Sequence, residues 1–425
     1  MNDIQFNHPY DLLNYYFNKE NETLDLKYRQ KLSEEILPFL TKTEDGSYTF
    51  KSPDFNDEIS ENMHTIAGAI SESFEKFVNP LKLDWNISEE IAILDLCSGF
   101  GYNSAAFLNH FIEIQDEFNL SNSLRIDMIE KSSEICKIAL VMPTIDFDSF
   151  KPINHNLIKR AIETKLFNSK LISIKLYENY KFNDKIKINL FIEDMREKVK
   201  SLPSNIYDGI FLDAFSPKLA PELYTIDFFK ELQRVIKNTG QIVTYTSSIP
   251  VKSALIEAGF YIGKGSVFGR KTPGTIASLS KDRINLDLDS DEERLIALSD
   301  LGIPFRDENL TLNSQEVINQ RNSKRKKLRN KTLISSAVKT PIYLGIDLNQ
   351  ENITKNNHII EDKLKRRILR NLNEFGLDST ISSDAMKIIA SQNMDDKENY
   401  KNNSRDRILA MKKALNNFFK ENKMS

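Results

Sequence analysis

An alternation of apolar strands with helical stretches, which begins near residue 91, constrains the fold of this chain more than any other feature of its sequence. Apolar segments that read as strands lie at 92–97, 124–131, 185–194, 207–215 and 240–247, and helical patterns follow them. Strands that are apolar throughout are typical of a parallel sheet whose two faces are both covered by helices. The pattern therefore predicts an α/β fold built on a mostly parallel sheet.

The last two predicted strands break this alternation. The segments "FYIGKGSVFG" and "TIASLSK" follow one another without a helix between them, which predicts a hairpin that closes the sheet. Such a hairpin makes one strand antiparallel at the sheet edge. This is a distinguishing feature of class I methyltransferases that use S-adenosylmethionine (SAM), so we expect a Rossmann-like, mostly parallel sheet of seven strands with one antiparallel edge strand.

Helical patterns flank this region on both sides. We expect a helical N-terminal extension at 1–40, a methyltransferase domain at 41–283, a basic tail at 284–331, and a helical or partly disordered C-terminal extension at 332–425. Two amphipathic helices are expected within 1–40. Other predicted elements are a short hairpin at 43–50 and helices at 64–78, 155–180, 223–236, 387–393 and 405–419.

The formal net charge of −3 conceals an uneven distribution of charge. The stretch 321–331 contains seven basic residues and no acid, namely Arg321, Lys324, Arg325, Lys326, Lys327, Arg329 and Lys331. A second basic cluster consists of Lys363, Lys365, Arg366, Arg367 and Arg370. Two interpretations stay open: a solvated or disordered stretch, or a surface that binds the phosphates of a nucleic acid.

Several classes of protein are excluded by composition. The two cysteines, Cys97 and Cys136, form neither a disulfide framework nor a CxxC pair, so a reducing compartment is expected. The five histidines are scattered without ligand spacing, and we expect no metal site. No apolar run approaches the ~18 residues of a membrane helix, and the N-terminus lacks a signal sequence. We expect a cytoplasmic protein, and its oligomeric state stays open.

Glycine and acidic residues at the predicted strand ends indicate a nucleoside site. Gly99 and Gly101 lie in the turn after the first strand, where glycine lets a ligand approach the backbone. Glu130 ends the second strand, where a carboxylate can accept both ribose hydroxyls, and Asp194 ends the third, where an acid can meet an adenine amine. The third glycine of a dinucleotide motif is replaced by Ser104, which favours SAM.

Structural alternatives exist for each of these residues. The glycines can serve helix–sheet packing, Glu130 can be a solvated strand end, and Asp194 can cap the helix that follows it.

The fourth strand ends in the sequence "FLDAFSPKLAP", which carries an acid, a ring and a proline within five positions. The carboxyl ends of central strands face the ligand crevice of such a sheet. An amine nucleophile needs an acceptor that holds its N–H and takes a proton, and Asp213 fits that role. Phe215 is suited to stack on a base, and Pro217 stiffens the loop. Alternatively, Asp213 caps the next turn.

Three motifs together resemble a known family. "GFGYN", "DAFSP" and "FGRK" occur in this order, and with their surroundings they are similar to the methyltransferase domain of the MnmC-like tRNA 5-methylaminomethyl-2-thiouridine methyltransferases. The resemblance covers about residues 41–331. It implies SAM contacts from Gly99, Gly101, Tyr102, Asn103, Glu130 and Asp194. It also implies that Asp213, Phe215 and Pro217 lie beside the amine that is methylated.

The same resemblance extends to two flanking segments. Glu61 and His64 match a family segment near the crevice, although a structural role for His64 stays open. Arg270 and Lys271 match the "FGRK" motif, where a contact to an RNA phosphate or a plain surface pair is expected. Bifunctional members add a flavin-dependent oxidase domain with a GxGxxG motif, which this chain lacks. The expected activity is therefore methyl transfer alone.

The predicted function is SAM-dependent N-methylation of the aminomethyl group of wobble uridine, with the tRNA anticodon loop as partner. Because that uridine is unpaired in its loop, splaying it out costs only a few kcal/mol. Two alternatives stay open: methylation of a small amine or polyamine, which the acids would suit, and a non-catalytic scaffold that binds RNA.

Overall fold

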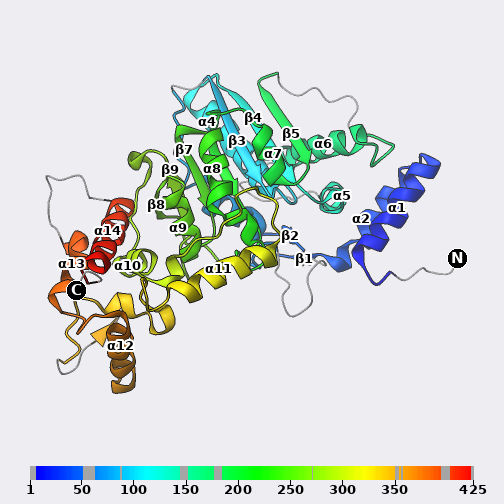
Figure 1. Cartoon of the computed structure of the whole chain (residues 1–425). Coiled ribbons are helices and arrows are strands. Elements are labelled where there is room, and N and C mark those ends of the chain that lie inside the picture. Colours follow the sequence, from blue (N-terminus) through cyan, green and yellow to red (C-terminus); the bar gives the residue numbers. More distant parts are fainter. Residues whose placement is uncertain are drawn as a thin grey trace. The chain divides into compact units, whose positions relative to one another are not determined.

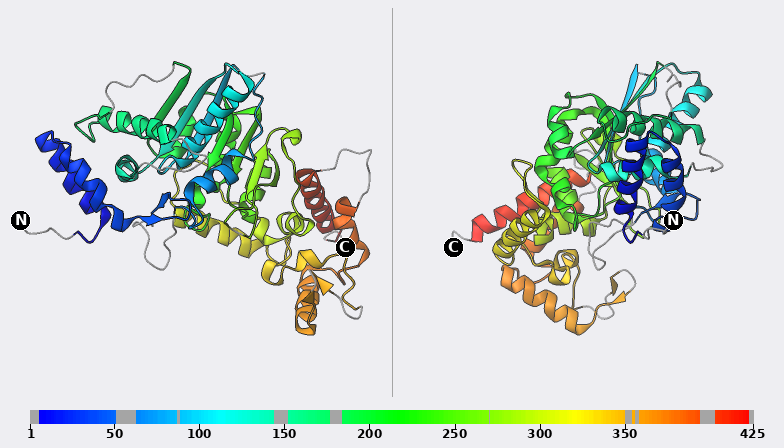
Figure 2. Two further views of the ribbon diagram at one scale, coloured as in Figure 1. Left: turned by 180° about the vertical axis from the view of Figure 1, so that it is seen from behind. Right: turned by 90° about the vertical axis from the view of Figure 1, so that its right-hand side faces the viewer.

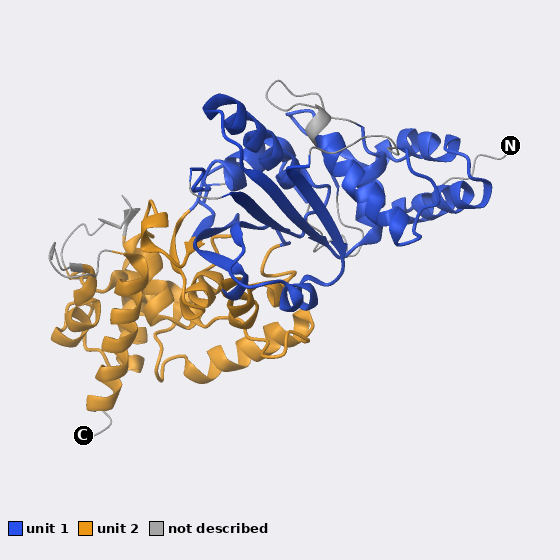
Figure 3. Cartoon of the chain, turned by 90° about the horizontal axis from the view of Figure 1, so that it is seen from above, with its two compact units in different colours: residues 1–215, 234–245, 265–276 blue, residues 216–233, 246–264, 277–425 orange. Residues whose placement is uncertain are grey.

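The computed structural model describes residues 6–50, 63–86, 89–143, 152–176, 184–269, 271–349, 354–355, 358–393 and 403–422. The chain divides into two compact units, which Figure 3 distinguishes by colour. Unit 1 comprises residues 1–215, 234–245 and 265–276, and unit 2 comprises 216–233, 246–264 and 277–425. Each unit is described by itself below, and the division into four segments expected from the sequence stays a prediction.

A seven-stranded sheet has the strand order β5-β4-β3-β6-β7-β9-β8 (Figure 1). Its strands are β3 (Glu90–Leu96), β4 (Ser123–Glu130), β5 (Ile186–Ile192), β6 (Tyr207–Leu212), β7 (Ile236–Thr244), β8 (Tyr261–Lys264) and β9 (Thr275–Ser278). The pairs β3–β4, β3–β6, β4–β5 and β6–β7 are parallel. The last two strands, β8 and β9, are neighbours at one edge, as the sequence predicted. The expected α/β fold of a class I methyltransferase is thereby confirmed.

Strand register brings the polar strand ends together. Leu96 at the end of β3 pairs with Ile129 of β4 on one side and with Leu212 of β6 on the other. Since these strands are parallel, their carboxyl ends lie at the same edge of the sheet. The residues that follow, including Glu130 and Asp213, therefore emerge side by side.

Helices of unit 1 pack with the sheet around one core, in which Leu13, Phe107, Ile126 and Ile158 are fully buried. These helices are α1 (Pro9–Thr23), α2 (Lys27–Glu35), α3 (Ala69–Ser73), α4 (Tyr102–Phe118), α5 (Ser133–Val141), α6 (Pro152–Asn168) and α7 (Met195–Ser201). A π-helical turn, η2 (Phe74–Val78), continues α3. A hairpin of β1 (Thr41–Lys42) and β2 (Tyr48–Thr49) lies between α2 and α3 in the chain, as expected at 43–50.

The N-terminal extension forms two helices, as predicted, and α1 and α2 lie side by side in both views of Figure 2. Their contact with the rest of unit 1 includes a buried ionic cluster. The Arg29 guanidinium pairs with Glu20 of α1 and donates to Glu163 Oε1 of α6 over 2.6 Å. It also donates to the Ile174 carbonyl oxygen at 3.0 Å. Since both carboxylates are fully buried, the single guanidinium balances two charges inside the protein.

Two predicted elements have different bounds in the structure. The helical stretch expected at 64–78 begins only at Ala69, after Gly68, whose φ of 130° no helix allows. The strand expected at 240–247 begins already at Ile236 and contains a bulge before Gln241, because Ile236 pairs with Tyr207 and Gln241 pairs with Gly209. The helix before it, α8 (Ile226–Val235), therefore passes directly into the strand. Part of the helical insertion expected at 155–180 lies outside the described residues.

Unit 2 contains most of the C-terminal helices. They are α9 (Ile249–Glu257), α10 (Ser290–Leu298), α11 (Ser314–Leu328), α12 (Asp362–Phe375), α13 (Ser383–Asn393) and α14 (Ser404–Asn422). Helices α13 and α14 confirm the predictions at 387–393 and 405–419, whereas α12 was not predicted as a helix. No helix among the described residues combines the length and the apolar character that a membrane span requires.

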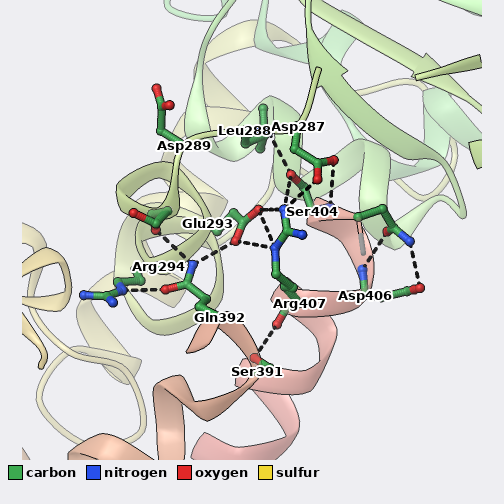
Figure 4. A network of polar contacts seen from close by, with 12 residues as sticks. Asp287, Leu288, Asp289, Glu293, Arg294, Ser391, Gln392, Ser404, Asp406 and Arg407 are labelled. Carbon is green, nitrogen blue, oxygen red and sulfur yellow. Dashed lines mark hydrogen bonds and ion pairs between the residues drawn. The ribbon is translucent and has the colours of Figure 1, made fainter. Parts of the chain in front are cut away.

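A polar network joins three of these helices (Figure 4). Arg407 of α14 pairs with Glu293 of α10 at 2.6 Å and with Asp287 at 2.8 Å. Gln392 of α13 donates to Glu293 Oε2 at 2.8 Å and accepts from Arg294 Nε at 2.6 Å. Glu293 is almost fully buried, so its charge depends on the arginine of a helix that lies over a hundred residues away in sequence.

Candidate active site

The turn between β3 and α4 has an unusual backbone. Cys97, Gly99 and Gly101 all have positive φ angles, of 58°, 53° and 79°. A Cβ on Gly99 would lie 2.7 Å from Met63 Cε, and one on Gly101 would lie 2.5 Å from Ile158 Cγ2. Gly99 is therefore favoured by its conformation, and Gly101 by its conformation and by the lack of space beside Ile158. Cys97 adopts the left-handed conformation despite its side chain, which is strain of the kind that concentrates at binding sites.

Glu130 fastens this turn to the end of β4. Its Oε2 accepts a hydrogen bond from Gly99 N–H at 3.1 Å, and its Oε1 accepts one from Ser132 N–H at 2.9 Å. Burial raises the pKa of Glu130, and these two backbone N–H groups work in the opposite direction. Glu130 is thus a half-buried strand end whose two oxygens are held by the backbone, rather than a freely solvated one. A carboxylate has about four lone-pair sites, so two remain for hydroxyl donors.

Buried polar atoms without partners surround the same turn. Asp95 Oδ1, Ser98 Oγ and Asn103 Oδ1 have no hydrogen-bond partner among the described residues. Because unsatisfied buried polar atoms are rare in native proteins, each of these atoms needs a partner from water or from a bound molecule. SAM fits this set, since its ammonium, ribose hydroxyls and adenine amine supply the donors that these acceptors and Glu130 lack. The conformation of the turn, the acid at the end of β4 and the unpartnered acceptors therefore suit this cofactor.

Asp95 was not predicted as a site residue. It lies on β3, is fully buried, and accepts a hydrogen bond from the Ser104 hydroxyl at 2.6 Å. Burial, with added repulsion from Asp213 and Glu130, raises the pKa of Asp95 to about 7. The sequence signal was present, because Asp95 is the only acid within the apolar segment 92–97.

Asp213 follows β6 and is half-buried. Its Oδ2 accepts a hydrogen bond from Asn103 Nδ2 at 2.9 Å, which links the end of β6 to the first turn of α4. Burial raises the pKa of Asp213; the charge of Glu72 adds to this rise, whereas His64, Asn103 and Lys76 oppose it. A carboxylate so placed is a stronger proton acceptor than an exposed aspartate.

Glu72 and Lys76, which act electrostatically on Asp213, were missed by sequence reasoning. Glu72 accepts a hydrogen bond from Thr65 N–H at 2.9 Å and pairs with Lys76, and both charged side chains are buried. Although burial works to raise the pKa of Glu72, His64 and Lys76 lower it below its ordinary value. Lys76 Nζ also lies 5.9 Å from the centre of the Tyr245 ring. The group thus combines acidic, basic and aromatic side chains.

His64 and Tyr102 lie in contact. Their ring centroids are 5.5 Å apart, and the His64 backbone N–H donates to Thr49 Oγ1 at 2.9 Å. The Tyr102 hydroxyl is buried and donates to the Tyr48 carbonyl oxygen at 3.1 Å. Tyr102 therefore connects the turn between β3 and α4 to the β1–β2 hairpin. His64 lies near this ring and near the charges of Glu72 and Asp213.

Asp194 caps a helix, which was the alternative interpretation of this residue. It is the N-cap of α7, with Oδ1 accepting from Arg196 N–H at 3.0 Å and Oδ2 pairing with Arg196 and Lys131 at 3.1 and 3.3 Å. The Arg196 contacts, with the charge of Lys131, hold the pKa of Asp194 low although burial opposes them. A contact to adenine stays a prediction for this residue.

Three of the remaining predicted residues lie within the described ranges. Phe215 and Pro217 are half-buried, with Phe215 in unit 1 and Pro217 in unit 2, and Lys271 is exposed. Its loop passes close to the His64 segment, because a Cβ on Gly269 would lie 3.0 Å from the Thr65 hydroxyl. Two further predicted residues, Glu61 and Arg270, lie outside the described residues.

Comparisons with known proteins identify relatives of this chain. The family described as "S-adenosyl-L-methionine-dependent methyltransferase" matches residues 159–280. The uncharacterized protein MJ0670 of Methanocaldococcus jannaschii is 35% identical over 355 residues, which are 82% of this chain and 86% of that protein. Among solved structures, MNMC2 from Aquifex aeolicus has a TM-score of 0.53 at 27% identity and covers 75% of this chain and 99% of its own.

A longer relative matches only in part. The tRNA 5-methylaminomethyl-2-thiouridine biosynthesis bifunctional protein MnmC of Leptospira interrogans is 27% identical over 210 residues, or 46% of this chain. The match spans 28% of that protein, less than a third of its length.

Proposed function

This chain belongs to the MnmC2-like family of S-adenosyl-L-methionine-dependent methyltransferases, and on that basis we propose that it methylates the aminomethyl nitrogen of wobble uridine in tRNA. The reaction would convert a 5-aminomethyl-2-thiouridine type of nucleoside into its 5-methylaminomethyl form. No flavin-dependent oxidase step is part of the proposal, because the sequence lacks a GxGxxG motif.

The observation that carries the proposal is the position of Asp213. Its carboxylate follows the central strand β6, and Asn103 from the helix after the cofactor turn fixes one of its oxygens. Burial raises its pKa, which favours proton uptake from a nitrogen nucleophile. An acid at this place suits an amine substrate.

The cofactor would be held by the turn and by the strand-end acids. We assign the ribose hydroxyls to Glu130 and the backbone approach to Gly99 and Gly101. The unpartnered oxygens of Asp95 and Asn103 would accept from the donors of the cofactor. When bound, the cofactor supplies an electrophilic methyl group on a cationic sulfur, and the surrounding carboxylates stabilise that charge.

Within the site, Asp213 would accept an N–H of the substrate amine and thereby orient the nitrogen lone pair. The amine must be neutral when it attacks, and the same carboxylate takes up the proton that the nitrogen releases. Glu72 and Lys76 would set the charge around Asp213, and Phe215 would stack on the splayed base.

A tRNA substrate is supported by the names of the MnmC relatives and by the exposed Lys271 in the "FGRK" loop. It also implies action in the cytoplasm, where tRNA is modified. Arg270 and Glu61 are kept in the proposal as substrate contacts on the basis of the motif alone.

The decisive experiment uses tRNA from cells that lack this gene. The purified protein and SAM are incubated with that tRNA, and the wobble nucleosides are analysed by mass spectrometry. We expect one added methyl group on the aminomethyl nitrogen. The Asp213→Ala variant serves as the matched control, and it should bind SAM normally but transfer the methyl group at least about 100-fold more slowly.

Each alternative has its own outcome in this experiment. Methylation of spermidine with tRNA left unchanged would replace the RNA substrate by a small amine. Failure of calorimetry to detect SAM binding, together with tight tRNA binding, would indicate a non-catalytic scaffold. Normal turnover by Asp213→Ala would remove the role assigned to this residue.

A further inference from the structure

We propose that the exposed basic face of α12 binds the phosphate backbone of the RNA substrate, which makes the C-terminal extension a second RNA-binding surface. This face consists of Lys363, Arg366, Arg367 and Arg370, all of which are exposed. The inference rests on the proposed function, because it assigns a surface to the same substrate class. It adds a binding site in a part of the chain for which the family resemblance gave no expectation.

Helical spacing places the four cations on one side of α12. They occupy positions i, i+3, i+4 and i+7, and residues with this spacing are neighbours at about 5–6 Å between Cβ atoms. The row extends for roughly 10 Å along the axis, since each residue adds 1.5 Å. A row of this length offers charge to several consecutive phosphates rather than to a single ion.

These four cations do not pair with acidic side chains among the residues that the structure describes. Lys363, Arg367 and Arg370 form no ion pair there, and Arg366 donates only to the Asp362 carbonyl oxygen at 3.4 Å. The acid at the start of the helix is instead paired with Lys365 at 3.8 Å. The charge of the face therefore remains available to a partner.

The opposite side of α12 holds the helix in place. Ile368 and Leu372 are fully buried, and the Phe375 ring packs on Phe418 and Phe419 at centroid distances of 5.9 and 5.0 Å. This argues against insertion of α12 into a membrane surface, because a helix that lies there buries its apolar side among the lipids. It also presents the basic face rigidly, which lowers the entropy cost of binding.

The residue types favour phosphates. Three of the four cations are arginines, whose planar guanidinium groups bind phosphate oxygens in a bidentate manner. The arginines of α11 differ from those of α12, because they contact groups of the protein itself. There, Arg321 donates to the carbonyl oxygens of Ile303 and Leu301, and Arg325 pairs with Asp300 at 2.8 Å.

Helix α11 adds to the surface through its lysines. Lys324, Lys326 and Lys327 are exposed and have no acidic partner within the described ranges. The end of α11 is attached to α12, since Asn330 accepts from Asn371 Nδ2 at 3.1 Å and donates to Glu374 Oε2 at 2.7 Å. Both groups of cations thus belong to one connected part of unit 2.

The test is the salt dependence of tRNA binding by the full chain, measured by fluorescence anisotropy with an unmodified tRNA transcript. The variant Arg366→Gln/Arg367→Gln/Arg370→Gln removes three charges from the face. Since each phosphate contact contributes about 0.7–0.9 to the slope of log K against log salt, the slope should fall by about 2. We expect affinity at moderate salt to fall at least tenfold.

Two control proteins accompany this variant. The variant Lys170→Gln/Lys187→Gln/Lys413→Gln loses three exposed charges elsewhere and should keep the wild-type slope. The charge-conserving Arg366→Lys/Arg367→Lys/Arg370→Lys variant should restore most of the slope. Circular dichroism and SAM binding confirm that each variant is folded, which is expected because every changed side chain is at the surface.

The outcomes separate this inference from the proposed function. A wild-type slope in the glutamine variant, while tRNA is still methylated, overturns the α12 surface and leaves the function standing. Absence of both tRNA binding and tRNA methylation by the wild type overturns both. Charge-dependent binding to vesicles of phosphatidylcholine and phosphatidylserine, or displacement of tRNA by poly-glutamate at equal charge, would assign the face to a membrane or an acidic protein instead.

Discussion

At the scale of single residues, Glu130 holds the turn between β3 and α4, and we propose that it also binds the ribose hydroxyls of SAM. Its carboxylate binds two backbone N–H groups and retains lone pairs for hydroxyl donors. The Glu130→Ala variant should therefore weaken SAM binding by about 1–3 kcal/mol, the value of lost charge-assisted hydrogen bonds. Turnover at saturating SAM should change little, because Asp213 remains in place.

Calorimetry and single-turnover kinetics measure these two effects. The Asp213→Ala variant is the natural comparison, since it should show the reverse pattern. Unchanged SAM affinity in Glu130→Ala would refute the assignment of this acid to the cofactor.

Asp95 makes a prediction about pH. Burial raises its folded-state pKa to about 7, well above its ordinary value. Between about pH 4 and pH 7 the folded protein therefore holds a proton that the unfolded chain has released, so stability falls as pH rises through this window. The loss is complete above pH ~7 and amounts to at most roughly 4 kcal/mol.

The Asp95→Asn variant should lack this loss. Its free energy of unfolding relative to the wild type should increase from about pH 5 to about pH 8, as measured by urea denaturation at several pH values. A difference that stays constant across this range would contradict a raised pKa at Asp95. The new amide itself changes the free energy of unfolding by the same amount at every pH, and this contribution does not affect the test, which depends on the change with pH.

Part of the site could be predicted residue by residue. Glu130 and Asp213 were predictable because they end apolar segments, and parallel strands bring such ends to one edge. Glu72 and Lys76 were not, since an acid and a lysine four residues apart on a helix normally form a solvated pair. Their burial depends on contacts with segments far away in sequence, such as Tyr245.

At the scale of elements, the N-terminal helices depend on one buried arginine. The Arg29→Met variant would remove the guanidinium that pairs with the buried carboxylates of Glu20 and Glu163. Removal of one member of a buried ion pair costs about 3–5 kcal/mol, and we expect a destabilisation of this size with early proteolysis within residues 9–35.

The control is Lys31→Met on the same helix. Lys31 is exposed and pairs with Glu35 at 3.5 Å, so its loss should change stability by less than about 1 kcal/mol. Equal denaturation midpoints for the two variants would show that the buried cluster does not hold the N-terminal helices.

Element boundaries show where sequence patterns reach their limit. The existence of the seven strands followed from apolar runs, whereas the bulge in β7 depends on pairing with Tyr207 and has no local signal. Helix α12 was overlooked because its sequence "DKLKRRILRNLNEF" reads first as a charge cluster. Its apolar residues, Leu364, Ile368 and Leu372, have helical spacing, which would have identified it.

At the scale of the whole molecule, the residues Gly99 and Glu130, which we propose to bind SAM, and the Arg407 network belong to different units. The Arg407→Met variant leaves Glu293 buried without its partner, so unit 2 should unfold at a lower temperature. SAM affinity should be unchanged, because Gly99 and Glu130 lie in unit 1. Calorimetric scans with and without SAM measure both effects.

The matched control for this prediction is Lys413→Met, which alters an exposed side chain of the same helix. Saturation with SAM at about 100 times its Kd should stabilise unit 1 by about 2.7 kcal/mol and move only its transition. If Arg407→Met abolished SAM binding, the two units would not be thermodynamically separate.

The hydrogen bond from Gly99 N–H to the Glu130 carboxylate has a consequence for the kinetics of binding. Because the carboxylate already accepts hydrogen bonds from the N–H groups of Gly99 and Ser132, the ribose site that we propose for Glu130 is formed before any nucleoside binds. The nucleoside then binds to a preorganised site, and little conformational entropy of the loop is lost on binding. Association should accordingly proceed in a single phase whose observed rate rises linearly with nucleoside concentration, without a plateau set by a slow rearrangement.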